Sequence, residues 1–298
     1  QCLVGSEMCI RDRHIRGCKM RYKIVIDSCG ELIERWKEDP SIERASLTLT
    51  VDEEDIVDDE SFDQAYFLKR VAESPNCPKS SCPSPERYME AYDCEADHVY
   101  AVTLSSELSG SYNSAVLGRN LLLENCPEKK IHIFNSRSAS VGETLIALKI
   151  EECENRNMEF EDIVQEVEAY IESQNTYFVL ESLETLRKNG RLSNLKAFVA
   201  TALKIKPVMG ATPEGTIVQL DQARGINKAL MKMVDYIVER SENSSDRILG
   251  ISHCNCRERA EIVKDAIIKR IPVKDVVLLD TAGVSSMYAN DGGIIVVI

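Results

Sequence analysis

The chain has 298 residues, of which 44% are hydrophobic and 29% charged, with 14 Gly and 9 Pro. This composition is typical of a soluble globular protein and argues against a disordered or fibrous chain. The formal net charge of −13 argues against non-specific attraction to nucleic acid or anionic lipid. No apolar run approaches the roughly 18 residues that a membrane span needs. A cytoplasmic protein without stable membrane insertion is therefore expected.

Residues 1–19 differ from the rest of the chain, since they show no sustained hydrophobic period and hold three of the eleven cysteines. Residues 4–13 (VGSEMCIRDR) resemble translated sequencing-adapter sequence rather than a targeting peptide. We expect residues 1–19 to be a non-native or disordered leader, with Met20 as the true start.

Nine short runs of strand-forming residues follow, and helical apolar stripes, such as those within 163–171 and 230–238, separate several of them. The predicted strands are 22–26, 98–104, 131–134, 176–180, 204–209, 216–220, 247–252, 276–279 and 294–298. Connections of a dozen or more residues between the first strands predict an α/β fold with a parallel sheet.

The second half has a different pattern, because only residues 210–215 separate two predicted strands, which favours an antiparallel hairpin. We therefore expect two domains, an N-terminal parallel-sheet α/β domain (20–172) and a smaller C-terminal α+β domain (173–298). The acidic run 52–60 is interpreted as a solvated hairpin or loop rather than a metal site.

The common catalytic fingerprints for dinucleotides, phosphate loops, nucleophile elbows and zinc proteases do not occur in the sequence. The run from His253 to Cys256 (HCNC) is the one group that looks like a set of metal ligands, and no second cluster of suitable spacing accompanies it. The cysteines are interpreted as reduced thiols in a reducing compartment. No cofactor and no metal are expected.

Hydroxyl residues concentrate in 80–85, 105–111 and 136–142. The second run follows a predicted strand and precedes a helix expected to begin around residues 109–112. Hydroxyls and free backbone N–H groups would then converge at a helix N-terminus, which favours an anion. Simple N-capping by Ser109 is the alternative interpretation.

A basic segment at residues 183–193 (LETLRKNGRLS) predicts a helix that ends at Gly190 in a left-handed cap. Arg187, Lys188 and Arg191 would either compensate the helix dipole or form a basic surface for an acidic partner or phosphate. We assign these three residues to partner binding.

Six segments, in this order along the chain, resemble the DegV family of bacterial fatty-acid-binding proteins, and Arg224 in QARGINKAL adds a seventh match. The segments are 24–28 (IVIDS), 80–85 (SSCPSP), 105–115 (SSELSGSYNSA), 134–142 (FNSRSASVG), 183–193 and 203–209 (LKIKPVM). The resemblance implies a two-domain carrier that encloses one long-chain fatty acid in an apolar tunnel between its domains. It also implies a separate fatty acid kinase that phosphorylates the carried carboxylate with ATP for phospholipid synthesis, so that the carrier itself is no enzyme.

Carried over by position, the resemblance assigns the fatty acid carboxylate to hydroxyl groups in two loops. Ser80 or Ser81 would supply one donor, and Ser105 or Ser106 the other. Gly110 would let the backbone approach the ligand.

The C-terminal segment 282–293 departs from the family pattern, in which a loop histidine lies near the carboxylate. Ser285, Ser286 or Tyr288 would supply a replacement donor.

Two other functions remain open. A serine-dependent acyl hydrolase or transferase would acylate Ser105 or Ser106 and use a histidine such as His253 as base. A binder of another small anion would use the same hydroxyl groups without a long tunnel.

Overall fold

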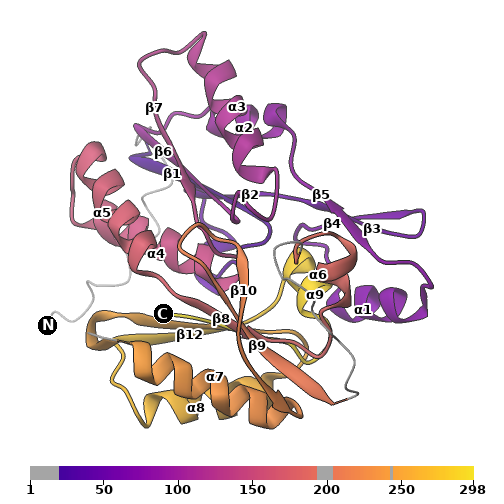
Figure 1. The fold of residues 1–298 in the computed structure, drawn as a ribbon. Helices are drawn as coiled ribbons and strands as arrows, with labels where there is room; N and C mark the ends of the chain where they lie inside the picture. Colours follow the sequence, from indigo (N-terminus) through magenta and orange to yellow (C-terminus); the bar gives the residue numbers. More distant parts are fainter. Residues whose placement is uncertain (1–19, 193–203, 242–243) are drawn as a thin grey trace, which may run out of the picture.

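The computed structural model describes residues 20–192, 204–241 and 244–298, so the expectation for residues 1–19 lies outside the described residues. Two large sheets and one small sheet carry the described chain, with helices between and around them (Figure 1). No helix in this part of the chain combines the length and apolar character that crossing a bilayer requires.

The first sheet has the order β2-β1-β6-β7, and all of its strand pairs are parallel. Its strands are β1 (Tyr22–Asp27), β2 (Ile42–Ala45), β6 (His98–Thr103) and β7 (Lys130–Asn135). Ile24 packs against the side that carries α4 (Val141–Asn155) and α5 (Phe160–Ser173), whereas Val25 faces α2 (Pro85–Tyr92) and α3 (Ser111–Leu123). Covered faces on both sides explain the nearly continuous apolar strands, and the predicted parallel sheet is confirmed.

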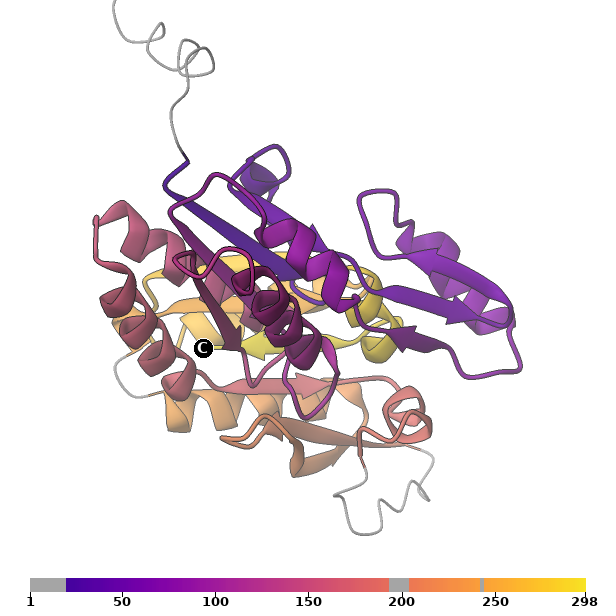
Figure 2. The same cartoon turned by 90° about the horizontal axis from the view of Figure 1, so that it is seen from above.

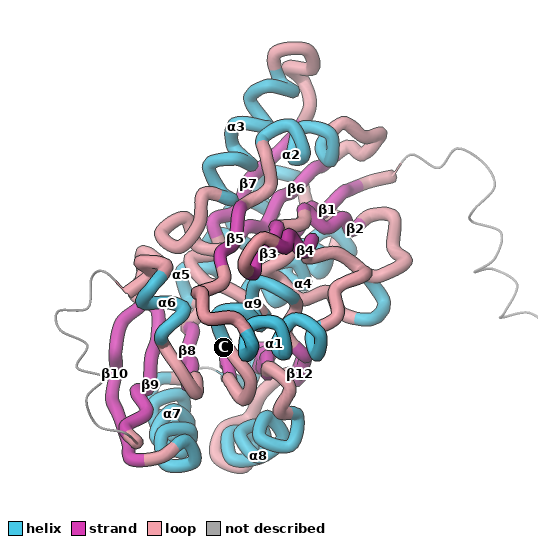
Figure 3. Tube along the Cα trace, turned by 90° about the vertical axis from the view of Figure 1, so that its right-hand side faces the viewer, coloured by secondary structure: helices cyan, strands magenta, loops and turns pink. Residues whose placement is uncertain are grey.

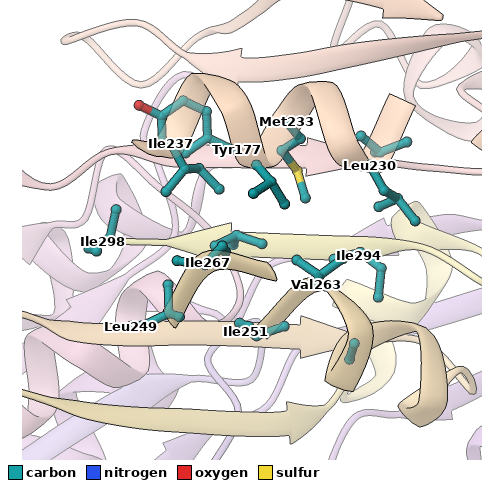
Figure 4. Packing of buried hydrophobic residues seen from close by; sticks show 14 of the residues in the cluster. Tyr177, Leu230, Met233, Ile237, Leu249, Ile251, Val263, Ile267, Ile294 and Ile298 are labelled. Carbon is teal, nitrogen blue, oxygen red and sulfur yellow. The ribbon is translucent and has the colours of Figure 1, made fainter. Parts of the chain in front are cut away.

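The second sheet has the order β10-β9-β8-β13-β11-β12, with only β11 and β12 parallel. Its strands are β8 (Thr176–Val179), β9 (Ile205–Ala211), β10 (Ile217–Arg224), β11 (Ile248–His253), β12 (Asp275–Asp280) and β13 (Ile294–Val297). The expected hairpin is confirmed, because β9 and β10 pair antiparallel across a short turn. Two helices, α7 (Ile226–Arg240) and α8 (Arg257–Ile268), pack on one face, where Met233 and Val263 meet side chains of the sheet (Figure 4).

A small antiparallel sheet, β4-β3-β5, projects from the two large ones together with α1 (Gln64–Glu73) (Figure 2). Its strands are β3 (Thr48–Val51), β4 (Glu54–Val57) and β5 (Lys79–Ser81). Asp52 turns the chain between β3 and β4 with φ 57°, so the acidic run does form a hairpin.

Short elements complete the fold: η2 (Glu34–Trp36), α6 (Glu184–Lys188), η3 (Ser244–Asp246) and α9 (Gly283–Ala289). Helix α9 lies beside α1 and α6 (Figure 3). The proposed domain boundary near residue 172 falls in the last turn of α5, shortly before β8. Because α4 packs on both large sheets, through Ile150 on the first and Leu145 on the second, that boundary stays a prediction.

Candidate functional site

A cavity with about 740 Å³ of empty space, part of it open to solvent, lies where loops of the parallel sheet meet the second sheet and α9. Its apolar lining comes from both halves of the chain. The apolar residues are Leu104, Leu108, Phe178, Leu180, Leu186, Ile217, Val284 and Ile295.

Several hydroxyl side chains of the cavity wall are bonded to protein partners. Ser138 Oγ lies 2.6 Å from Thr176 Oγ1, and Ser285 Oγ donates to the carbonyl oxygen of Cys29 at 3.0 Å. Ser140 Oγ donates to the carboxylate of Glu31 at 2.8 Å. Because most of these hydroxyl groups already have a protein partner, the wall is suited to hydrocarbon rather than to a polar chain.

The guanidinium of Arg191 lines the cavity. The preceding residue, Gly190, has φ 76° and forms the left-handed cap, which confirms the predicted helix end. Arg191 Nε donates to the carbonyl oxygen of Leu108 at 3.1 Å, and the guanidinium lies 5.9 Å from the ring centre of Tyr288. No ion pair to Arg191 occurs within the described ranges. The guanidinium therefore keeps donor capacity for an anionic ligand.

The other two predicted partner-binding residues lie elsewhere. Arg187 and Lys188 are exposed on α6, and Arg187 pairs with Glu184 at 2.7 Å. Arg191 is thus separated from Arg187 and Lys188, and the structure brings it to the cavity instead. The assignment of all three to one partner surface stays a prediction.

Helix α9 places the three C-terminal candidates on different sides. Ser285 and Tyr288 line the cavity, whereas Ser286 Oγ lies 2.7 Å from Thr281 Oγ1 and accepts from Gln64. Burial raises the pKa of Tyr288, and a hydrogen bond with Ser80 partly offsets this rise. Tyr288 is therefore a neutral hydroxyl donor at the cavity.

The strand β5 carries both serines of the first predicted loop. Ser80 pairs with Leu49 across the small sheet and contacts Tyr288, while the neighbouring Ser81 is exposed. Neither serine is among the cavity-lining residues, although Ser80 is one contact away through Tyr288.

The second predicted loop lies at the junction of the two sheets. Ser105 is fully buried, and its Oγ donates to the carbonyl oxygen of Gly215 at 2.9 Å. Ser106 Oγ accepts from Asn135 Nδ2 at 2.8 Å. Gly110 precedes α3 and is exposed, and a Cβ there would lie 3.3 Å from the Cys82 sulfur. Both hydroxyls have protein partners, so their contact with a carboxylate stays a prediction.

Three buried carboxyl groups lie close to the cavity and were not identified from the sequence: Asp27, Glu31 and Glu143. Asp27 accepts from Ser111 Oγ at 2.6 Å and from the Leu104 N–H at 3.0 Å. Glu143 is fully buried, neither of its oxygens has a hydrogen-bond partner among the described residues, and burial holds its pKa well above the usual value. Two features of the sequence could have indicated these carboxyl groups: the polar residues Asp27 and Ser28 at the end of the first strand, and the polar residues at the start of α4.

His253, the candidate base of a serine-dependent acyl hydrolase or transferase, lies apart from these residues. His253 ends β11, with its Nδ1 3.3 Å from Asp280 Oδ1, and does not line the cavity. No hydrogen bond joins His253 to Ser105 or Ser106 among the described residues. In the same ranges no group of three His, Cys, Asp or Glu residues is arranged to hold a metal ion.

Comparison with protein families gives a match over residues 21–298 to the family described as "Uncharacterised protein, DegV family". A DegV domain-containing protein of Streptococcus pyogenes is 35% identical over 278 residues, which cover 93% of this chain and 98% of that protein.

Solved structures resemble the fold closely. A DegV family protein from Ruminococcus gnavus, described with vaccenic acid, is 56% identical with a TM-score of 0.92, covering 94% of this chain and 100% of its own. The fatty acid kinase (Fak) B3 protein of Streptococcus pneumoniae, loaded with linoleic acid, is 31% identical with a TM-score of 0.85, covering 93% and 99%. A DegV family protein from Eubacterium eligens, loaded with heptadecanoic acid, is 27% identical with a TM-score of 0.84, covering 93% and 98%.

Proposed function

This chain belongs to the DegV family, and from that premise we propose that it binds one long-chain fatty acid in the cavity between its two large sheets. The observation that carries the proposal is the cavity itself, with an apolar wall contributed by both halves of the chain and the guanidinium of Arg191, which forms no ion pair in the described ranges. The similar proteins from Ruminococcus gnavus and Streptococcus pneumoniae, described with vaccenic and linoleic acid, support the same ligand class.

The hydrocarbon tail supplies most of the binding free energy. Each buried methylene contributes about 0.8 kcal/mol, so a chain of about fourteen methylenes provides a large driving force, from which the cost of ordering the chain is subtracted. The hydroxyls of Ser138 and Thr176 are hydrogen-bonded to each other, so a hydrocarbon neighbour does not break this bond.

The carboxylate needs donors, and Arg191 is one of the two arginines that line the cavity, with Arg137 as the other. Tyr288 lies beneath the guanidinium of Arg191, and Ser80 contacts Tyr288. We propose that the carboxylate binds at this group, with Ser105 and Ser106 as a second set of donors if the Ser105 hydroxyl leaves Gly215. Fixed donors here would set the orientation of the ligand more than its affinity.

We propose further that the protein is a cytoplasmic carrier that presents the fatty acid to a separate kinase and catalyses no reaction itself. The Fak B3 neighbour supports a kinase partnership. The exposed pair Arg187 and Lys188 on α6, four and three residues before Arg191, suits an acidic surface on such a partner.

Delipidation and reloading test this function. The full chain is stripped of lipid, titrated with oleic acid, and then mixed with ATP and a bacterial fatty acid kinase. We expect one fatty acid per chain and acyl-phosphate only when kinase and carrier are both present. Release of free acid from an ester by the chain alone would favour a hydrolase, and binding of short carboxylates without long ones would favour a small-anion binder.

A further inference from the structure

A buried carboxyl group, that of Glu31, joins three distant parts of the chain directly behind the cavity wall. Glu31 is 3% exposed, and its two oxygens accept from Ser140 Oγ at 2.8 and 2.9 Å. Ser252 Oγ, in β11, donates to Oε2 at 3.0 Å. The loop after β1 is thereby bonded to the start of α4 and to the second sheet, 109 and 221 residues away.

The groups that face Glu31 carry no positive charge. Asp27 and Cys29 come from β1 and its loop, and Glu143 comes from α4. From β11 and α9 the facing groups are the hydroxyls of Ser252 and Ser285, since His253 is turned to Asp280. No lysine or arginine pairs with Glu31 in the described ranges. Burial raises the pKa of Glu31 to about 7, and the three serine hydroxyls oppose the rise.

The same hydroxyls belong to the cavity. Ser140 and Ser285 line it, and both lie within hydrogen-bonding reach of Glu31. We expect a ligand held between the two sheets to leave faster when they part. Parting at this point would separate Glu31 from Ser252 and admit water to the carboxylate. An ionised carboxylate gains more from that water than a protonated one.

We propose, resting on the function proposed above, that Glu31 is a pH-responsive clamp between the two sheets, which holds the cavity closed when protonated and favours its opening when ionised. Fatty acid exchange is then slow in mildly acidic conditions and faster above neutrality. The clamp regulates release at the same site that binds the lipid.

Proton linkage determines whether the cavity opens or closes as pH rises. The closed state has the higher pKa, about 7, and a hydrated Glu31 has its usual value near 4.5, so the closed state binds the proton more tightly. Protonation of Glu31 stabilises the closed state fully below about pH 4.5, the pKa of the hydrated carboxyl group. This stabilisation is lost as pH rises through about 7, the pKa in the closed state. Between pH 6 and pH 8 the opening equilibrium rises by about tenfold.

Stopped-flow transfer of a bound fluorescent 18-carbon fatty acid to albumin, from pH 6 to pH 8.5, measures this exchange. We expect the rate of the full chain to rise by about tenfold between pH 6 and pH 8. The side chain in Glu31→Gln is neutral at every pH. Transfer from this variant should therefore remain slow, with no change in rate between pH 6 and pH 8. The matched control Glu38→Gln, an exposed carboxyl, should behave as the unchanged protein.

Equal pH profiles for Glu31→Gln and the unchanged chain would overturn the clamp while leaving fatty acid binding intact. Failure to bind the fatty acid at any pH would instead overturn the proposed function. Ser252→Ala covers the case in which Glu31→Gln does not fold. It removes one donor to the ionised form, so the midpoint of the exchange profile should move to higher pH, and an unmoved midpoint would contradict the clamp.

Discussion

Ser105 Oγ donates a hydrogen bond of 2.9 Å to the carbonyl oxygen of Gly215, joining the loop after β6 to the turn of the β9–β10 hairpin. Gly215 has φ 91°, and a Cβ there would lie 2.3 Å from the same hydroxyl. Only glycine allows this approach. The segment 105–115, which carries much of the resemblance to the DegV family, therefore joins the two halves of the chain beside the cavity through Ser105.

Ser105→Ala should lower the free energy of unfolding by about 1 kcal/mol, because one buried hydrogen bond is lost and the Gly215 carbonyl is left without this donor. Chemical denaturation measures it.

The double change Ser105→Ala, Ser106→Ala should still fold and should retain less fatty acid after reloading, by about ten- to a hundredfold in affinity. Undiminished retention would place the carboxylate with Arg191, Tyr288 and Ser80 alone.

Arg191→Met should weaken binding of oleic acid by about ten- to a hundredfold, since a charge-assisted contact to the carboxylate is lost. Fluorescent-ligand competition measures the affinity. Methyl oleate, which has no charge, should bind the variant and the unchanged chain alike. Arg187→Met is the control, because Arg187 is exposed and pairs only with Glu184 in the described structure. An equal loss for acid and ester would mean that Arg191 shapes the cavity rather than binding the anion.

Most of the fold was predictable because most strands of the two large sheets contain short apolar runs. All nine predicted strands occur, with ends shifted by a few residues at most. The small sheet escaped prediction for a physical reason. Its strand β4 alternates half-buried and exposed residues within an acidic run, and β5 has only three residues. Such strands form through pairing with β3 rather than through their own hydrophobic period.

The site was predictable only in part. The motifs identified the hydroxyl loops, but which hydroxyls face the cavity depends on contacts such as Ser105 with Gly215, 110 residues apart. Arg191 was expected at a partner surface, and its place at the cavity follows from its bond to the Leu108 carbonyl. Long-range packing of this kind leaves no local pattern in the sequence.

Ala211→Leu should shift the preference of the protein toward shorter fatty acids. Ala211 lines the cavity at the end of β9, and three added carbons take up space that the tail would fill. Affinity for an 18-carbon acid should fall by about tenfold, the effect of roughly 1.4 kcal/mol. Competition between 14- and 18-carbon acids measures it. Ala72→Leu, on the exposed side of α1, should leave the preference unchanged.

Glu143→Gln should stabilise the protein increasingly as pH rises from 5 to 8. Burial, followed by the nearby charge of Asp27, raises the pKa of Glu143 in the folded state, so the native chain keeps a proton that the unfolded chain releases. The resulting loss of stability, at most about 1.4 kcal/mol per pH unit for one proton, disappears with a neutral side chain. Thermal melts across this range check it. Glu172→Gln, an exposed carboxyl, is the control; equal behaviour of the two variants would contradict the prediction.

Native mass spectrometry of the full chain after recombinant expression tests the central claim most directly. We predict a species heavier than the apo-protein by the mass of one long-chain fatty acid, with that mass lost on denaturation and recovered as free acid. Retention of the added mass on the denatured chain would indicate an acyl-enzyme, and a chain that carries no lipid and accepts none on reloading would contradict fatty acid carriage.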